Sequence, residues 1–182
     1  FYNGGQSCCA VERIYVHESI FDIFVEKAIE FLNKLKIGDP MDEATDIGPM
    51  AQNSGIKTVE RQLKDAEDKG AKIIRHSGTV PMGEKYLLPV ILTNVNHNME
   101  IMMEETFGPI IGIMAVKSDE EAIQLMNDSP YGLTASVWTN DAEKAIQIGN
   151  RIETGTFFMN QCDFLDPALP WVGVKDSGKG CT

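Results

Sequence analysis

The sequence predicts an α/β fold: a three-layer domain with a mainly parallel sheet and helices on both faces. Three observations lead to this prediction. Short runs rich in β-branched residues alternate with helical patterns of about ten or more residues. One run, residues 110–116, is apolar throughout, as expected for a strand covered on both faces. Glycine and proline residues separate these runs, a pattern that predicts successive βαβ units.

The first half of the chain is predicted to contain two amphipathic helices. In the first, apolar residues recur at steps of three and four, and Ser19 is the predicted N-cap. Gly38 is predicted to end that helix, because glycine adopts the left-handed conformation easily and Pro40 cannot continue the ladder. In chain order we expect a strand at 13–16, a helix from 19 to 38, a loop at 39–49, a helix at 51–69 ended by Gly70, and strands at 71–75 and 88–95.

The second half repeats the alternation. Ser118 with Glu121 forms a capping-box pattern, and Asn140 with Glu143 forms another. In chain order we expect a buried strand at 110–116, a helix from 118 to about 127, a turn at 130–132, a strand at 133–139, a helix from 140, and a last strand at 156–159.

Charge and hydropathy exclude several classes of function. The 182 residues include 16 Lys and Arg against 27 Asp and Glu, a formal charge of −11. Such a surface repels phosphate backbones and anionic membranes, so we expect no nucleic-acid or membrane partner. No apolar run approaches the roughly 18 residues that a membrane span needs. The chain starts at Phe1 without a methionine and reads as a piece of a longer polypeptide.

The cysteines and histidines predict neither disulfides nor a metal site. The cysteines show no CxxC spacing, a pattern typical of a reducing cytosol, so we expect a cytoplasmic protein. His17, His76 and His97 are scattered, and no zinc-binding spacing occurs. The four cysteines are Cys8, Cys9, Cys162 and Cys181.

The first ten residues are the most informative for chemistry. A glycine turn at Gly4 and Gly5 delivers Cys8 to the start of a structured element, where backbone N–H groups could favour the thiolate. The alternative is that Cys8 is a small buried hydrophobe. The residues alone leave both interpretations open.

Two other motifs have competing interpretations. Glu104 and Glu105 could form a general acid–base pair, or a solvated pair without a catalytic role. Residues 173–180 nearly match the P-loop pattern of a nucleotide-binding module. That pattern fails at Gly180, which supplies no hydroxyl for magnesium, so we disfavour a P-loop.

The spacing Phe-x-x-x-Gly-Gln-x-Cys at residues 1–8 resembles the cysteine signature of the aldehyde dehydrogenase superfamily. The resemblance continues along the whole chain in the correct order, which chance rarely produces. The further matching motifs are Gly38-Asp39-Pro40, Gly48-Pro49, Glu105-x-Phe107-Gly108-Pro109, Tyr131-Gly132-Leu133, Gly155-Thr156 with Asn160, and Pro170-x-x-Gly173-x-Lys175-x-Ser177-Gly178.

The resemblance implies a role for particular residues. Cys8 lies where the family has its nucleophile, which attacks an aldehyde to give a thiohemiacetal and then a thioester. Glu105 matches the glutamate that hydrogen-bonds the ribose next to the nicotinamide, and Phe107 matches the aromatic near the ring. Asn160 and Trp171 match the substrate-tunnel segment. A core role for Phe107, and a purely packing role for the loop that carries Trp171, are the structural alternatives.

The resemblance also implies the wider organisation. Residues 1–182 would be the catalytic, cysteine-bearing domain, Rossmann-like in fold, of an NAD- or NADP-dependent enzyme that oxidises an aldehyde to an acid. Most of the cofactor-binding domain, the C-terminal end, the general base and a second oxyanion donor would be absent, so the isolated chain is expected to be inactive. The full-length enzyme is expected to be a homo-oligomer, a dimer or tetramer.

Val172 departs from the family's usual glycine, which puts close backbone packing there in doubt. The non-enzymatic alternative is a domain with an interaction or structural role.

Overall fold

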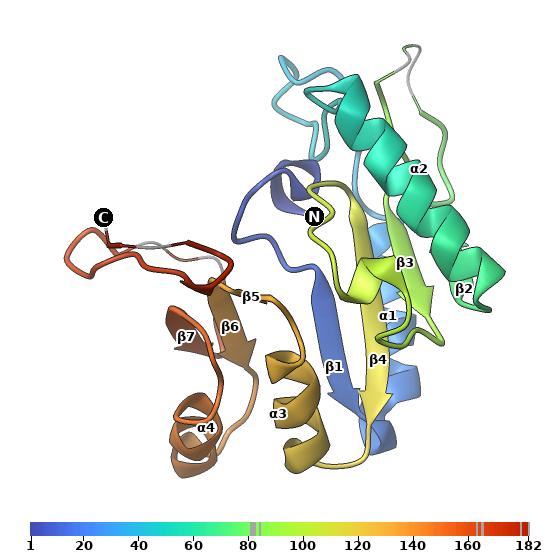
Figure 1. Cartoon of the computed structure of the whole chain (residues 1–182). Coiled ribbons are helices and arrows are strands. Elements are labelled where there is room, and N and C mark those ends of the chain that lie inside the picture. Colours follow the sequence, from blue (N-terminus) through green and yellow to red (C-terminus); the bar gives the residue numbers. More distant parts are fainter. Residues whose placement is uncertain (81–82, 84, 163, 165, 179, 182) are drawn as a thin grey trace. The chain divides into compact units, whose positions relative to one another are not determined.

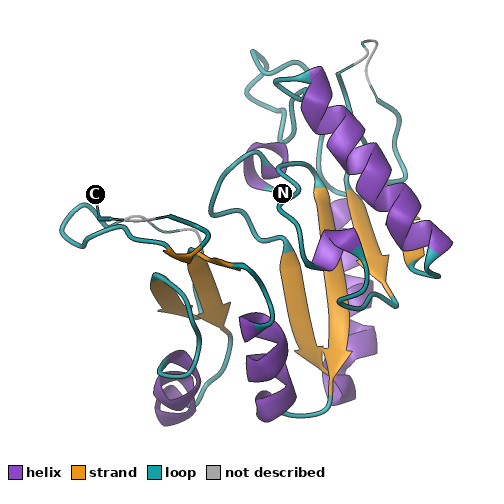
Figure 2. Ribbon diagram, viewed as in Figure 1, coloured by secondary structure: helices purple, strands orange, loops and turns teal. Residues whose placement is uncertain are grey.

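The computed structural model describes residues 1–80, 83, 85–162, 164, 166–178 and 180–181. The chain divides into two compact units, Phe1–Ala115 and Val116–Thr182, which are described separately below (Figure 1). Each unit combines helices with strands (Figure 2). The α/β class predicted from the sequence is therefore confirmed.

The first unit is built on a four-stranded sheet with the order β1-β4-β3-β2. β3 and β4 are parallel, with Val90 opposite Ile110, and β2 pairs with β3 antiparallel. β1 runs in the same direction as β4 (Figure 1). The strands are β1 (Arg13–His17), β2 (Lys72–Arg75), β3 (Val90–Thr93) and β4 (Ile110–Val116).

Helices cover both faces of this sheet. Successive side chains of a strand point to opposite faces, so Leu92 of β3 packs in one core cluster with Val59 of α2 (Asn53–Asp68). The adjacent residue, Ile91, packs in the other core cluster with Leu32 of α1 (Phe21–Leu32). The three-layer prediction is confirmed in this unit. Short 3-10 turns complete it: η1 (Tyr2–Gly5), η2 (Glu18–Ile20) and η3 (Glu100–Met102).

The second unit contains two small sheets and two helices. β6 pairs with β7 in parallel, with Thr134 opposite Thr156, and β5 pairs with β8 antiparallel. The sequence indicated only a turn where β5 lies, and it did not indicate β8. The elements are α3 (Asp119–Asn127), β5 (Tyr131–Gly132), β6 (Thr134–Val137), α4 (Ala142–Gly149), β7 (Thr156–Met159) and β8 (Val174–Lys175).

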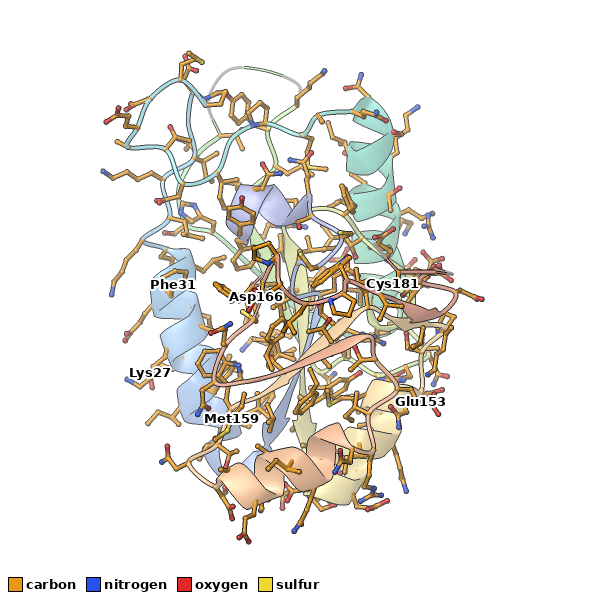
Figure 3. All side chains as sticks on the ribbon, turned by 90° about the vertical axis from the view of Figure 1, so that its left-hand side faces the viewer. Lys27, Phe31, Glu153, Met159, Asp166 and Cys181 are labelled. Atoms are coloured by element: carbon orange, nitrogen blue, oxygen red, sulfur yellow. The ribbon has the colours of Figure 1, made fainter. Side chains whose placement is uncertain are left out.

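The first helix is shorter than predicted at both ends. Ser19 does not cap it: its N–H donates to Nδ1 of His17, and α1 begins at Phe21. The helix ends at Leu32, not at Gly38, because the Lys36 N–H, which a longer helix would direct to the Leu32 carbonyl, donates to the Asp46 carboxylate instead (2.8 Å). The outer face of α1 carries Lys27 and the exposed Phe31 (Figure 3).

The caps of the later helices follow local side-chain chemistry. Ser118 caps α3 as predicted, with its hydroxyl accepting from the N–H of Glu121 (3.2 Å). The prediction for α4 was wrong by one residue. Asp141, not Asn140, is the N-cap, because its carboxylate accepts from the N–H of Lys144 (3.0 Å).

Candidate functional site

The cysteine loop, residues 1–10, is shaped by consecutive left-handed residues. Asn3, Gly4 and Gly5 have φ values of 51°, 64° and 72°. This coil leaves Cys8 exposed, whereas Cys9 is buried and its sulfur lies 3.3 Å from the Ser7 hydroxyl. The two adjacent sulfurs are therefore distinct, and Cys8 is the one that a reagent can reach.

Gln6 ties the cysteine loop to the segment before α2. Its side-chain oxygen accepts from the N–H of Ala51 (2.8 Å). Its amide nitrogen donates to the carbonyls of Asn3 (3.1 Å) and Pro49 (3.4 Å). The Gln of the cysteine motif and the Gly-Pro at 48–49 thus belong to one hydrogen-bonded arrangement, which the sequence motifs did not reveal.

The loop that carries Glu105 and Phe107, residues 104–109 (the glutamate loop), packs directly on the cysteine loop. A Cβ on Gly5 would lie 2.1 Å from the carbonyl oxygen of Gly108, so the two backbones are in contact. Only glycine permits this approach at Gly5, where φ is also positive. The predicted nucleophile and the predicted cofactor residues therefore lie on adjoining loops of the same unit.

Within the glutamate loop, the side chain of Glu105 is exposed and Phe107 is 41% exposed, with φ at 52°. Phe107 is therefore not the core aromatic that the structural alternative required. Below them, Gln62 of α2 is fully buried and donates to the carbonyl of Glu105 (3.3 Å). Its amide oxygen accepts from the hydroxyl of Thr106 (2.7 Å). A buried bond of this kind contributes about 1 kcal/mol and is costly to break singly.

Glu12 is a further residue of this region that the sequence did not single out. One carboxylate oxygen accepts from the N–H of Thr106 (2.9 Å) and of Phe107 (3.2 Å). Burial raises the pKa of Glu12, the two backbone N–H groups oppose that rise, and the Glu105 carboxylate adds to it. No local pattern could have indicated Glu12, because its partners lie more than 90 residues further along the chain.

Asn160 and Trp171 both lie in the second unit. Asn160 follows β7 with φ at 55°, and its amide bonds both the N–H and the carbonyl of Thr139 at 2.9 Å. Those bonds join the ends of β6 and β7. Trp171 is half-buried in the segment after the loop at 161–170, of which residues 163 and 165 lie outside the described residues. A substrate contact for either residue stays a prediction.

The glycine-rich motif at 173–178 has a structural explanation. Lys175 donates to the carbonyls of Asn127 (2.7 Å) and Ser129 (3.0 Å), and the Ser177 hydroxyl accepts from the N–H of Gly132 (2.9 Å). These bonds attach β8 to the turn after α3, so the motif stabilises the packing of β8 within the second unit. Lys179, the P-loop lysine of the disfavoured alternative, lies outside the described residues.

Backbone packing near Val172 is close despite the side chain there. A Cβ on Gly155 would lie 1.5 Å from the carbonyl oxygen of Val172. The close backbone packing that Val172 put in doubt is therefore present, and the missing side chain of Gly155 permits it.

The part of the chain that the structure describes contains no group of three or more His, Cys, Asp or Glu residues that could hold a metal ion. No helix in it is both long and apolar enough to cross a membrane.

In the first unit a sheet is covered by helices on both faces, and the exposed Cys8 lies on a loop that packs against the loop bearing the exposed Glu105. The family model for the aldehyde dehydrogenase family matches residues 1–182. The chain belongs to this family.

Individual relatives agree with the assignment. An aldehyde dehydrogenase of Paenarthrobacter nicotinovorans is 42% identical over 98% of this chain and 39% of the relative. Betaine aldehyde dehydrogenase of Staphylococcus aureus in complex with NAD+ superposes with a TM-score of 0.92 and 34% identity, over 99% of this chain and 37% of that one. NADP-dependent glyceraldehyde-3-phosphate dehydrogenase of Bacillus halodurans, complexed with NADP, superposes with a TM-score of 0.91 and 36% identity, over 100% and 37%. The chain thus spans well under half the length of these proteins.

Proposed function

We propose that this chain is the cysteine-bearing part of an NAD- or NADP-dependent aldehyde dehydrogenase that oxidises an aldehyde to a carboxylic acid. The observation that supports the proposal most directly is the backbone contact between Gly5 and Gly108. This contact brings the cysteine loop, which carries Cys8, against the glutamate loop, which carries Glu105. Family membership over all 182 residues supports the same reaction class.

In this proposal Cys8 is the nucleophile. Its thiolate attacks the aldehyde carbon, a C–S bond forms, and the carbonyl π electrons move to oxygen to give a thiohemiacetal. Cys8 is exposed, as an attacking sulfur must be, whereas Cys9 is buried and contacts Ser7. The chemistry that a nicotinamide supplies when bound is the acceptance of one hydride from the thiohemiacetal carbon. Water then hydrolyses the thioester that remains on Cys8, and the acid leaves.

The residues of the glutamate loop fit a dinucleotide. The Glu105 carboxylate is exposed and offers two acceptor oxygens at a spacing suited to vicinal ribose hydroxyls. Phe107 presents part of its ring to the surface, where a planar group can pack. We assign cofactor binding to these two residues, and substrate contacts to Asn160 and Trp171. The general base and a second oxyanion donor would come from a part of the enzyme outside this sequence.

We further propose that the full-length enzyme acts in the cytoplasm as a dimer or tetramer. The cysteine pattern, which lacks CxxC spacing, is typical of a reducing compartment. The family's reaction requires an aldehyde and a dinucleotide, and the excess of acidic residues argues against nucleic acid as a partner.

The test is aldehyde-dependent reduction of NAD+ and NADP+ by the full-length protein, with short aliphatic and aromatic aldehydes. Wild-type turnover that Cys8→Ala abolishes and Cys9→Ala retains would support the proposal. Cys9→Ala is the matched control because it removes the adjacent sulfur. Turnover that survives Cys8→Ala would contradict the assignment of the nucleophile. A wild-type protein without turnover on any aldehyde would favour the interaction or structural role.

A further inference from the structure

One carboxylate connects the segment that follows the cysteine loop to the glutamate loop. Oε1 of Glu12 accepts from the consecutive N–H groups of Thr106 (2.9 Å) and Phe107 (3.2 Å). Glu12 lies four residues after Cys8, so a single short stretch carries both the nucleophile and an anchor for the other loop. Consecutive N–H groups that converge on one anion form a small anion-binding concavity, here filled by the protein's own side chain.

The loop needs such an anchor, because its conformation is unfavourable by itself. Phe107 has φ at 52°, a left-handed conformation that costs an aromatic L-residue about 1 kcal/mol or more. A hydrogen bond to a charged acceptor is roughly twice as strong as one between neutral groups, so the two N–H bonds that Glu12 accepts can offset that cost. Gln62 provides a second anchor, through bonds to the carbonyl of Glu105 and the hydroxyl of Thr106.

Glu12 is itself held firmly. Its carbonyl accepts from the N–H of Gly112 in β4 (3.1 Å), and the neighbouring Arg13 donates to the carbonyl of Met102 (3.0 Å). The carboxylate therefore projects from a fixed backbone. Motion of the glutamate loop relative to the segment after Cys8 would break the bonds to Thr106 and Phe107.

We propose that Glu12 is a positioning residue for the cofactor: it holds the glutamate loop in the conformation in which Glu105 and Phe107 receive the nicotinamide half of the dinucleotide. This inference rests on the proposed function. Its chemical consequence is that Glu12 acts on hydride transfer through the loop and takes no part in the attack by Cys8. The Glu12 carboxylate is half-buried, burial raises its pKa, and the Glu105 carboxylate nearby carries the same charge. Holding an ionised carboxylate at this place therefore costs stability. A role in cofactor binding explains that cost.

The experiment compares Glu12→Ala, Glu12→Gln and Glu30→Ala in the full-length protein. Glu30 is an exposed carboxylate on α1 and serves as the matched control. Three quantities are measured: KM for NAD(P)+, the single-turnover rate of NAD(P)H formation, and the rate of alkylation of Cys8 by iodoacetamide without cofactor. A thermal melt of each variant shows whether it is folded.

Glu12→Ala is expected to raise KM for NAD(P)+ and slow hydride transfer by about tenfold or more, because the loop loses its orientation. Alkylation of Cys8 is expected to stay within about twofold of wild type, since the cysteine loop keeps its own contacts, from Gln6 to Ala51 and from Gly5 to Gly108. Glu12→Gln retains one acceptor oxygen and is expected to recover part of the loss, which also supplies a folded variant if Glu12→Ala is unstable. Glu30→Ala should match wild type.

Two results would overturn the inference alone. One is a wild-type enzyme that is active while Glu12→Ala and Glu12→Gln keep its KM and hydride-transfer rate. The other is an equal decrease of Cys8 alkylation and hydride transfer, because Glu12 would then support the whole region and not the cofactor. A wild-type protein without NAD(P)+-dependent turnover would instead overturn the proposed function, and this inference with it.

Discussion

The backbone of Gly5 lies against the backbone of Gly108, so closely that a Cβ on Gly5 would be 2.1 Å from the Gly108 carbonyl oxygen. A methyl group cannot fit there unless the two loops separate, because the obstacle is main chain and not a flexible side chain. The contact therefore makes the cysteine loop and the glutamate loop dependent on each other.

Gly5→Ala is predicted to destabilise the 182-residue chain by about 2–4 kcal/mol, from the left-handed φ and the backbone clash together. Gly70→Ala is the matched control, since Gly70 also has positive φ, at 89°, but a Cβ there meets nothing within 4 Å. Gly70→Ala should cost only about 1 kcal/mol. Urea unfolding of both variants measures the difference, and equal losses would mean that the contact with Gly108 is unimportant for stability.

Cys8 is predicted to react faster with iodoacetamide than Cys9, Cys162 or Cys181. Exposure alone does not explain this prediction, because Cys162 and Cys181 are also exposed. The prediction rests on the match of Cys8, within the Gly5-Gln6-x-Cys8 motif, to the nucleophile of the family. Substoichiometric labelling and peptide mass spectrometry decide the order of reactivity. Preferential labelling of Cys162 or Cys181 would contradict the assignment of Cys8 as the nucleophile.

Glu105→Gln in the full-length enzyme is predicted to slow hydride transfer by about tenfold or more, because the nicotinamide is held less well. Thioester hydrolysis should change much less, since Glu105 is assigned no proton transfer. Single-turnover kinetics separate the two steps, and Glu104→Gln, the neighbouring exposed carboxylate, is the control. Normal hydride transfer with blocked deacylation would identify Glu105 as the general base.

Glu12 is predicted to make stability depend on pH in a particular direction. Burial raises its pKa above the usual value of 4.5, so the folded chain binds this proton more tightly than the unfolded chain does. The stabilisation from the protonated form is complete below pH 4.5 and is lost as the pH rises through the raised pKa. The neighbouring charges that contribute are Glu105, which raises the pKa, and Arg13, which lowers it.

The measurement is the free energy of unfolding of the wild-type chain minus that of Glu12→Gln across pH 4 to 8, since glutamine has no proton to lose. This difference should fall as the pH rises. Glu30→Gln, which changes an exposed carboxylate, should show no such trend. A difference in free energy of unfolding that does not change with pH for Glu12→Gln would show that burial does not raise the pKa of Glu12.

The 182-residue chain is predicted to fold but to show no dehydrogenase turnover. Its first unit has a core on both faces of a sheet, and a chain of this length can bury enough apolar surface to be stable. The proposed hydride transfer, however, also needs contacts to the dinucleotide that we expect outside this sequence, because the chain spans only 39% of its aldehyde dehydrogenase relative. A cooperative melt, followed by NAD+ with a panel of aldehydes, tests both parts. NADH formation that Cys8→Ala abolishes would show that the residues present here suffice.

Local patterns in the sequence determined most of the elements. The apolar run of β4, the helical period of α2 up to Gly70, and the cap at Ser118 act through neighbours in the chain, so each was predicted correctly. Resemblance to the family supplied the roles assigned to Cys8 and Glu105, which stay predictions; it could do so because those motifs are contiguous in the sequence.

Only the tertiary structure decided the remaining features. Leu32 ends α1 early because the Lys36 N–H bonds the Asp46 carboxylate in the following loop and not the Leu32 carbonyl. Helix periodicity carries no information about that bond. The roles of Glu12 and Gln62 could not be found from the sequence, because both residues bond Thr106, which lies far along the chain. The separation is more than 40 residues for Gln62 and more than 90 for Glu12. A hydrogen bond acts over about 3 Å, so such pairs exist only once the chain has folded and brought them together.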